Sequence, residues 1–212
     1  MLQLREFWQW FEEHREIFYH LPQFTLQEQA FYHEALDIRL TAYHPHLAYV
    51  FLFPKENENA ELILTTNGQS DGMLWVKNLV LQAPSIPGWD ITAFIPPKIQ
   101  VEALKKGEEP PYKFKEVHLN PCHIVWTPVG MNEINDKHEL LFHIKGLGHE
   151  LEPVPYEKYI EYLGIVLLDF LGEIEVNRHI EQIYYDPVEF DGGEWYPLYR
   201  LPEYLAGESL EE

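Results

Sequence analysis

Apolar side chains recur every three to four positions over the first twenty residues of the chain, with large aromatic rings at Phe7, Phe11 and Phe18. On a helix this spacing places the apolar side chains on one face. We therefore expect an amphipathic helix over about residues 3–19, with an apolar stripe along one side.

A second helix is predicted by the residues at both of its ends. Thr25 followed three positions later by Glu28 is typical of a capping box at a helix start. At the other end, Pro45 disfavours helix in the residue before it and cannot donate a backbone hydrogen bond. The helix is therefore expected to end just before His44. We interpret His44 and His46 as part of this helix end, because a metal site needs three or four ligands and the pair supplies two.

The rest of the pattern repeats one order of elements twice. Strand, strand, helix and strand are predicted over residues 47–53, 61–66, 71–82 and 89–95, and again over residues 123–127, 138–144, 156–171 and 179–185. The sequence thus predicts an α+β (mixed α/β) fold. In it, two ββαβ-like halves form a sheet packed by helices, with two N-terminal helices and an ordered C-terminal tail.

The length of 212 residues suits a single compact domain. Its expected parts are the N-terminal helices (1–44), the first ββαβ half (45–96), a connector (97–120), the second ββαβ half (121–186) and the tail (187–212). A short helical piece is expected over residues 101–106 and a strand over residues 112–119. Large rings such as Trp195, Tyr196 and Tyr204 predict that the tail lies on the body of the protein, where they can be buried.

The net charge and the cysteine content indicate which kinds of partner and which cellular compartment to expect. The chain has 35 acidic and 15 basic residues, a formal net charge of −20, and such a charge repels phosphate backbones. We expect no nucleic-acid binding. We also expect no membrane partner, because no apolar run reaches the roughly 20 residues that cross a bilayer. The single cysteine, Cys122, leaves no internal disulfide and favours a reducing cytoplasm.

Several histidines lie in the region from His118 to His149, and among them His123, His138 and His143 are the candidate metal ligands. Adjacent strands could bring imidazoles onto one face, where a transition metal could bind. His138 and His143 are five residues apart, however, which puts their side chains on opposite faces of a regular strand. The sequence therefore favours surface or cross-strand histidines, with no metal and no cofactor.

No catalytic set is evident from the sequence. Cys122 and His123 are the residue types of a nucleophile and its base. Their expected geometry does not fit, because adjacent residues of a strand point apart and no Gly-rich oxyanion turn follows. Ser70 is expected to cap the following helix, and the acids after Gly172 are expected to lie in a solvated connecting loop. No phosphate-binding loop, dinucleotide fingerprint or nucleophile elbow occurs.

Three segments combine turn and helix-end motifs: ELILTTNG at residues 61–68, APSIPGW at residues 83–89 followed by AFIPP, and LLDFLGEIEV at residues 167–176. Together they resemble a family of conserved bacterial proteins of unassigned function, in scattered pieces over about residues 45–185. The resemblance implies a compact mixed α/β fold and a bacterial origin. It implies no substrate and no catalytic residue.

Three functions are compatible with these observations. The first is a protein-interaction module whose acidic surface suits a basic protein partner. The second is a small-molecule-binding protein or hydrolase with a cleft near the His118–His149 region. The third is a structural protomer that acts as a homodimer. We favour the first because it requires no unseen catalytic set.

Overall fold

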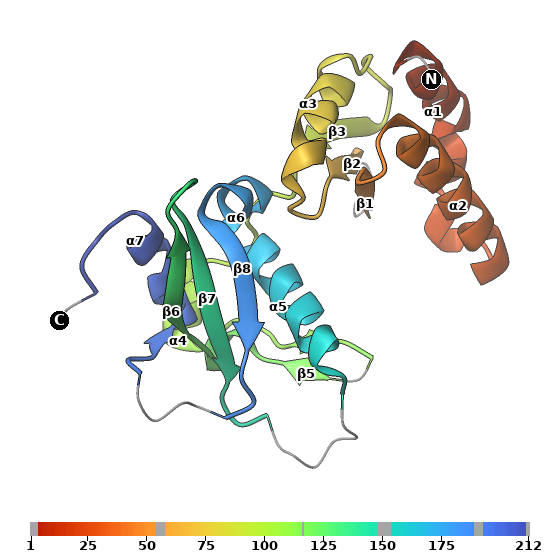
Figure 1. Cartoon of the computed structure of the whole chain (residues 1–212). Coiled ribbons are helices and arrows are strands. Elements are labelled where there is room, and N and C mark those ends of the chain that lie inside the picture. Colours follow the sequence, from red (N-terminus) through yellow and green to blue (C-terminus); the bar gives the residue numbers. More distant parts are fainter. Residues whose placement is uncertain (1–3, 54–57, 116, 148–153, 189–192, 211–212) are drawn as a thin grey trace. The chain divides into compact units, whose positions relative to one another are not determined.

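The computed structural model describes residues 4–53, 58–115, 117–147, 154–188 and 193–210 (Figure 1). The chain divides into two compact units, residues 1–95 and residues 96–212. The predicted α+β class is confirmed. The prediction that the two halves form one sheet is wrong: each unit has its own main sheet and its own apolar core. That the whole chain acts as one domain stays a prediction.

The first unit has the predicted ββαβ order after two helices. Its elements are α1 (Leu4–Tyr19), α2 (Leu26–Tyr43), β1 (Ala48–Leu52), β2 (Ala60–Thr65), α3 (Met73–Leu81) and β3 (Trp89–Ala93). β1 pairs with β2 in antiparallel fashion, β2 pairs with β3 in parallel, and β1 and β3 are the outer strands.

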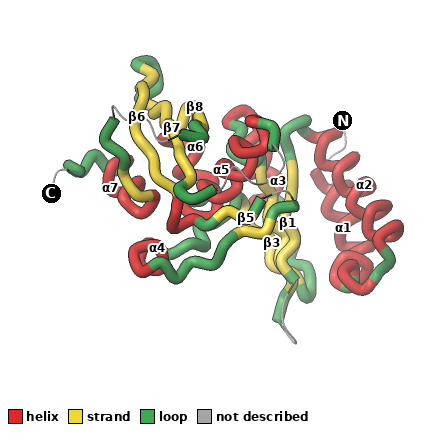
Figure 2. Tube along the Cα trace, turned by 90° about the horizontal axis from the view of Figure 1, so that it is seen from below, coloured by secondary structure: helices red, strands yellow, loops and turns green. Residues whose placement is uncertain are grey.

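The helices α1 and α2 form an antiparallel pair and lie side by side in both views (Figures 1 and 2). The guanidinium carbon of Arg39 lies 3.8 Å from the ring centroid of Trp10 across this pair. The predicted capping box is present at the start of α2, where the backbone N–H of Thr25 donates to the Glu28 carboxylate over 2.9 Å and the backbone N–H of Glu28 donates to the Thr25 hydroxyl over 3.3 Å. As predicted, α2 ends at Tyr43.

Aromatic side chains of α1 dominate the core of the first unit. This core also contains apolar residues of α2, of α3 and of one face of the sheet; its fully buried members include Phe11, Phe18, Leu36, Leu40, Leu62, Leu64 and Leu79. Tyr49 and Phe51 of β1 lie opposite Leu64 and Leu62 of β2. Since cross-strand partners share a face, these two rings belong to the face that packs against the helices.

The second unit repeats the strand pairing of the first. Its elements are α4 (Val101–Lys106), β4 (Tyr112–Lys113), β5 (His118–Leu119), β6 (Ile124–Asn132), β7 (Lys137–Ile144), α5 (Tyr156–Leu171), α6 (Glu173–His179), β8 (Ile180–Tyr185), β9 (Tyr196–Pro197) and α7 (Leu201–Leu205). The sheet has the order β8-β7-β6-β9, in which β6 and β7 are antiparallel while β7 and β8 are parallel. The second ββαβ half is therefore present, with two helices instead of one before its last strand.

Two local predictions in the second unit are wrong. Residues 112–119 do not form one strand, because Phe114 donates its N–H to the carbonyl of Val117 and the chain turns back to pair β4 with β5. The acids after Gly172 do not lie in a solvated loop. Gly172 has a φ of 79°, which ends α5 as predicted, and α6 begins at the next residue, Glu173, which is fully buried.

One local prediction in the first unit is also wrong. Ser70 does not cap α3 with its side chain; it begins a short 3-10 turn, Ser70–Gly72, that leads directly into the helix. The 3-10 turn supplies the first backbone hydrogen bond, from Met73 N–H to the carbonyl of Ser70, so the hydroxyl is not needed at the helix start.

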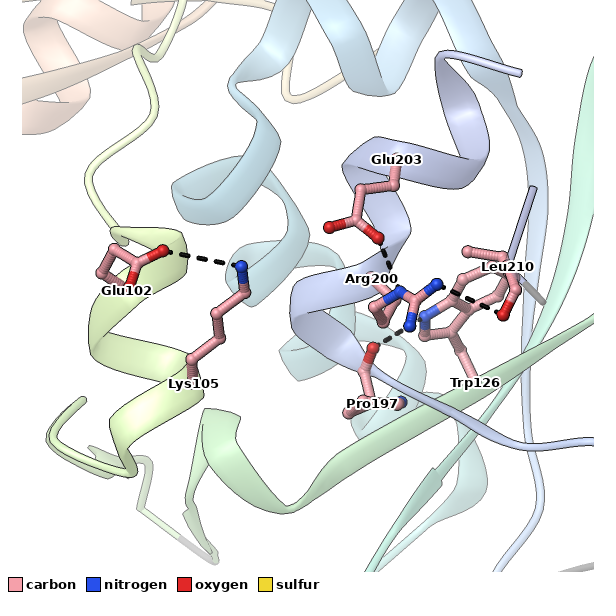
Figure 3. A network of polar contacts seen from close by, with 7 residues as sticks. All are labelled: Glu102, Lys105, Trp126, Pro197, Arg200, Glu203 and Leu210. Carbon is pink, nitrogen blue, oxygen red and sulfur yellow. Dashed lines mark hydrogen bonds and ion pairs between the residues drawn. The ribbon is translucent and has the colours of Figure 1, made fainter. Parts of the chain in front are cut away.

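The described part of the tail lies on the second unit, as predicted. Tyr196 pairs with Trp126 in β6, and the Trp126 indole N–H donates to the carbonyl of Pro197 over 3.2 Å (Figure 3). Arg200 pairs with Glu203 at 2.6 Å and donates to the carbonyl of Leu210 over 3.2 Å. These contacts fold the end of the chain back onto itself beside the buried indole.

Leu201, which is fully buried in the core of the second unit, tests how much the tail contributes. Leu201→Ala should lower the free energy of unfolding by about 2–5 kcal/mol, because it removes buried methyl groups and leaves a cavity. Urea unfolding followed by tryptophan fluorescence measures this change. Val188→Ala, at a side chain that is 62% exposed, is the control and should change the value by less than about 0.5 kcal/mol. Equal effects of the two substitutions would contradict the packing of the tail.

Candidate functional site

A groove of about 460 Å³ lies between α2 and the outer strand β1. Two polar residues of α2 and four residues at or beside β1 line it: His33, Asp37, Ala48, Tyr49, Phe51 and Phe53. We call it the α2–β1 groove. Titratable side chains and aromatic rings line this one space together.

The regular geometry of the two elements brings these side chains together. His33 and Asp37 are four residues apart, so they project from the same side of α2. Tyr49, Phe51 and Phe53 alternate along the chain, so their rings lie on one face of the strand and of its continuation. The packing of α2 along β1 therefore forms the groove.

A hydrogen bond of 2.6 Å joins Nδ1 of His33 to the hydroxyl of Tyr49, and the two rings are stacked with centroids 5.9 Å apart. Burial, and then the charge of Asp37, raise the pKa of the Tyr49 phenol well above its ordinary value. Both effects favour the protonated form of the phenol. When it donates this proton to Nδ1, the neutral imidazole carries its own proton on Nε2.

The carboxylate of Asp37 carries the unbalanced charge of the groove. Asp37 is exposed, and among the described residues its carboxylate has no hydrogen bond and no ion pair; it interacts electrostatically with His33 and Tyr49. Burial raises the pKa of Asp37 above its ordinary value of 3.8, and the charge of His33 opposes this effect only in part. An ionised Asp37 is therefore short of a positive partner.

Some other carboxylates of the chain have close partners. Asp169 of α5 accepts from the Lys98 ammonium at 3.0 Å and from the Tyr112 hydroxyl at 2.7 Å. Asp71 lies 2.7 Å from Nδ1 of His46. Glu109 also has a pKa raised by burial and no side-chain partner among the described residues. Asp37 differs because it lines a groove together with aromatic rings.

The aromatic wall of the groove is inclined rather than flat. The rings of Tyr49 and Phe51 are 5.1 Å apart at 61°, and those of Phe51 and Phe53 are 5.7 Å apart at 46°. Phe18 and Trp89 of the core each lie 5.4 Å from Phe51 and hold it in place. Rings set at steep angles can turn more than one electron-rich face toward a bound group.

The histidines singled out in the sequence occupy separate environments. His123 is exposed at the end of the 3-10 turn Pro121–His123. Nδ1 of His143 lies 3.0 Å from the carbonyl oxygen of Asp186. Nδ1 of His138 lies 3.2 Å from the Tyr204 hydroxyl of the tail.

His138 and His143 therefore each have a hydrogen-bond partner within the protein, at separate places. Burial, and then the charge of His179, lower the pKa of His138. Nowhere in the described part of the chain do three or more His, Cys, Asp or Glu side chains gather so that they could hold a metal ion. His149 lies outside the described residues.

The remaining sequence candidates are accounted for locally. His44 is the C-terminal cap of α2, as predicted, and its ring stacks on Trp75 with centroids 5.8 Å apart. Cys122 lies in the 3-10 turn with its sulfur 3.9 Å from the carbonyl oxygen of Glu109. Among the described helices, none is long and apolar enough to cross a membrane.

Comparison with known proteins adds no relative. A scan against protein-family models, a search of curated proteins and a search of solved structures each find no match to this chain. The resemblance to a bacterial family of unassigned function stays a prediction.

The hydrogen bond between His33 and Tyr49 can be tested through stability. Tyr49→Phe should lower the free energy of unfolding by about 0.5–1.5 kcal/mol, because it removes a partly buried hydrogen bond and keeps the ring. Tyr43→Phe is the matched control, since no hydrogen bond of the Tyr43 hydroxyl is present among the described residues, and it should have less than about 0.5 kcal/mol of effect. Urea unfolding of both variants decides; an equal response would show that the bond contributes nothing.

Proposed function

We propose that this chain is a binding protein that recognises an organic cation, such as the side chain of lysine or arginine, in the α2–β1 groove. The observation that carries the proposal is the carboxylate of Asp37, which has no hydrogen bond or ion pair among the described residues and lies in the same groove as the rings of Tyr49, Phe51 and Phe53.

The chemistry of the groove suits a cation in two ways. The exposed Asp37 carboxylate has no cation within ion-pair distance among the described residues, so the ammonium group of a ligand can pair with it, at a gain of up to about 1 kcal/mol. Aromatic faces attract an ammonium or guanidinium group by about 0.5–2 kcal/mol. Phe53, whose side chain is 40% exposed, is the ring that such a group reaches first.

The size and charge of the molecule support the same ligand class. A volume of about 460 Å³ falls within the range of roughly 300–1,000 Å³ that is usual for small-ligand sites, and it is ample for one basic side chain. The formal net charge of −20 attracts cations from a distance and raises their rate of arrival. It also makes a basic protein a better partner than a nucleic acid.

A cytoplasmic location and a bacterial origin are also part of the proposal. With one cysteine, Cys122, the chain suits a reducing cytoplasm, and the three motif segments suit a bacterial origin. A cleft in the His118–His149 region and a homodimer stay predictions. The α2–β1 groove is preferred because its polar and aromatic groups converge on one space.

Binding of N-acetyl-lysinamide, followed by NMR shifts of amides in β1 and α2, tests the proposal. We expect weak, saturable binding, and we expect Asp37→Asn to weaken it by about fivefold or more, which is the loss of about 1 kcal/mol of ion pairing. Glu34→Gln, which makes the same charge change on an exposed position of α2 outside the groove, should leave the affinity within about twofold. N-acetyl-norleucinamide, of similar shape without the charge, should not bind. Equal effects of the two substitutions, or equal binding of the two ligands, would refute the proposal.

The same site should give a pH dependence with a definite sign. The cation pairs with ionised Asp37, so its affinity should fall as the pH drops through the raised pKa of this carboxyl, before an ordinary aspartate would lose its charge. Stability should change in the opposite direction. Because the pKa is higher in the folded state than in the unfolded chain, ionised Asp37 opposes folding at neutral pH, and that penalty disappears at low pH.

Two variants show which side chain causes the pH dependence of cation binding. Asp37→Asn should leave the melting temperature unchanged or raise it at pH 7, and it should flatten the pH profile of cation binding. His33→Gln removes the charge change of the neighbouring imidazole from the profile. A profile that is lost in His33→Gln and kept in Asp37→Asn would contradict the role of the carboxylate.

A further inference from the structure

The strand beside the α2–β1 groove has a free edge. β1 is an outer strand, and among the described strands it pairs with β2 alone. All five of its residues pair in register, from Ala48 opposite Thr65 to Leu52 opposite Glu61, with no bulge. Its other edge therefore presents a regular row of backbone N–H and C=O groups in extended geometry.

β1 lacks three of the features by which outer strands commonly resist pairing with other chains: charged side chains, proline and bulges. Asp90 lies in β3, Glu181 lies in β8 and Pro197 lies in the short β9. The sequence of β1, AYVFL, contains no charged residue and no proline. Of the outer strands in the described three- and four-stranded sheets, β1 is the one suited to accept a further strand.

A strand added at this edge would have its side chains beside the groove. Neighbouring strands lie about 4.8 Å apart, and alternate side chains of each point to the same face of the sheet. Every second side chain of an added strand would thus point to the face that carries Tyr49 and Phe51. A lysine or arginine at such a position would extend toward the groove that the rings and the Asp37 carboxylate line.

We infer that the partner of this chain is a basic segment in extended conformation, which adds to the free edge of β1 and places a lysine or arginine side chain in the α2–β1 groove. The inference rests on the proposed function for the cation and adds the backbone pairing. Backbone hydrogen bonds would supply affinity, and the groove would supply specificity, as in other cases of strand addition.

A second copy of this chain fits the same edge less well. Pairing of β1 with β1 would bring together two chains that each carry a formal net charge of −20. It would also offer no cation to Asp37, because AYVFL has no basic residue. The charge of the groove therefore selects a basic partner over a self-pair.

Synthetic peptides can separate the backbone contribution from that of the side chain. The probe is a capped heptapeptide of alternating threonine and lysine, Thr-Lys-Thr-Lys-Thr-Lys-Thr, with glutamate in place of lysine as the control. In a paired strand every second amide points to the neighbouring strand. N-methylation of the amides of one parity should weaken binding by about tenfold or more, whereas N-methylation of the other parity should leave it within about threefold. Amides of β1 should exchange more slowly with deuterium when the peptide is bound.

The outcomes distinguish this inference from the proposed function. If N-acetyl-lysinamide binds through Asp37 but both methylated peptides bind like the unmodified one, strand addition is wrong and cation recognition stands. If one parity of methylation abolishes binding and Asp37→Asn has no effect, strand addition at the edge stands and the cation site is wrong. If the full-length protein is a dimer whose β1 amides are already protected and the peptide does not dissociate it, a second copy occupies the edge and the inference is overturned.

Discussion

The packing of α2 along the outer strand β1 is the constraint on which the candidate site depends. Leu36 and Leu40 are fully buried and fix the rotation of α2 about its axis, because a helix that rotated would expose both of them. With this rotation set, His33 and Asp37 lie beside the strand. The anchoring of Phe51 by Phe18 and Trp89 then fixes the opposite wall of the groove.

Two features that do not favour the stability of the isolated chain occur at the same place. One is the exposed carboxylate of Asp37, which has no partner among the described residues and a raised pKa, and the other is the uncharged, regular edge of β1. By contrast, Asp169 has two partners, and β3 and β8 each contain a charged residue. Binding sites commonly retain groups that are satisfied only by a ligand, at some expense in stability. The Asp37 carboxylate and the uncharged edge of β1 occur at the same place, and the proposed binding site rests on this.

Local sequence signals predicted most of the elements. Thr25 with Glu28 located the start of α2, and Gly172 located the end of α5, because a capping box and a left-handed glycine act within a few residues. The errors occurred where distant parts of the chain decide. Glu173 is buried by the fold around it, and nothing near it in the sequence indicates this.

The candidate site was missed for the same reason. His33 and Tyr49 are 16 residues apart and on different elements, so their hydrogen bond depends on how α2 packs on β1. The number of histidines from His118 to His149 indicated a possible metal site, yet His138 and His143 have hydrogen-bond partners at separate places. Two signals were available in the sequence: the spacing of four between His33 and Asp37, and the alternating rings from Tyr49 to Phe53.

The most direct measurement of the central claim is the NMR titration of the Asp37 side-chain carboxyl carbon, with and without saturating N-acetyl-lysinamide. The account predicts a pKa above the ordinary aspartate value in the free protein and a lower pKa in the complex, since the cation favours the ionised form; the same pKa in both states would contradict it.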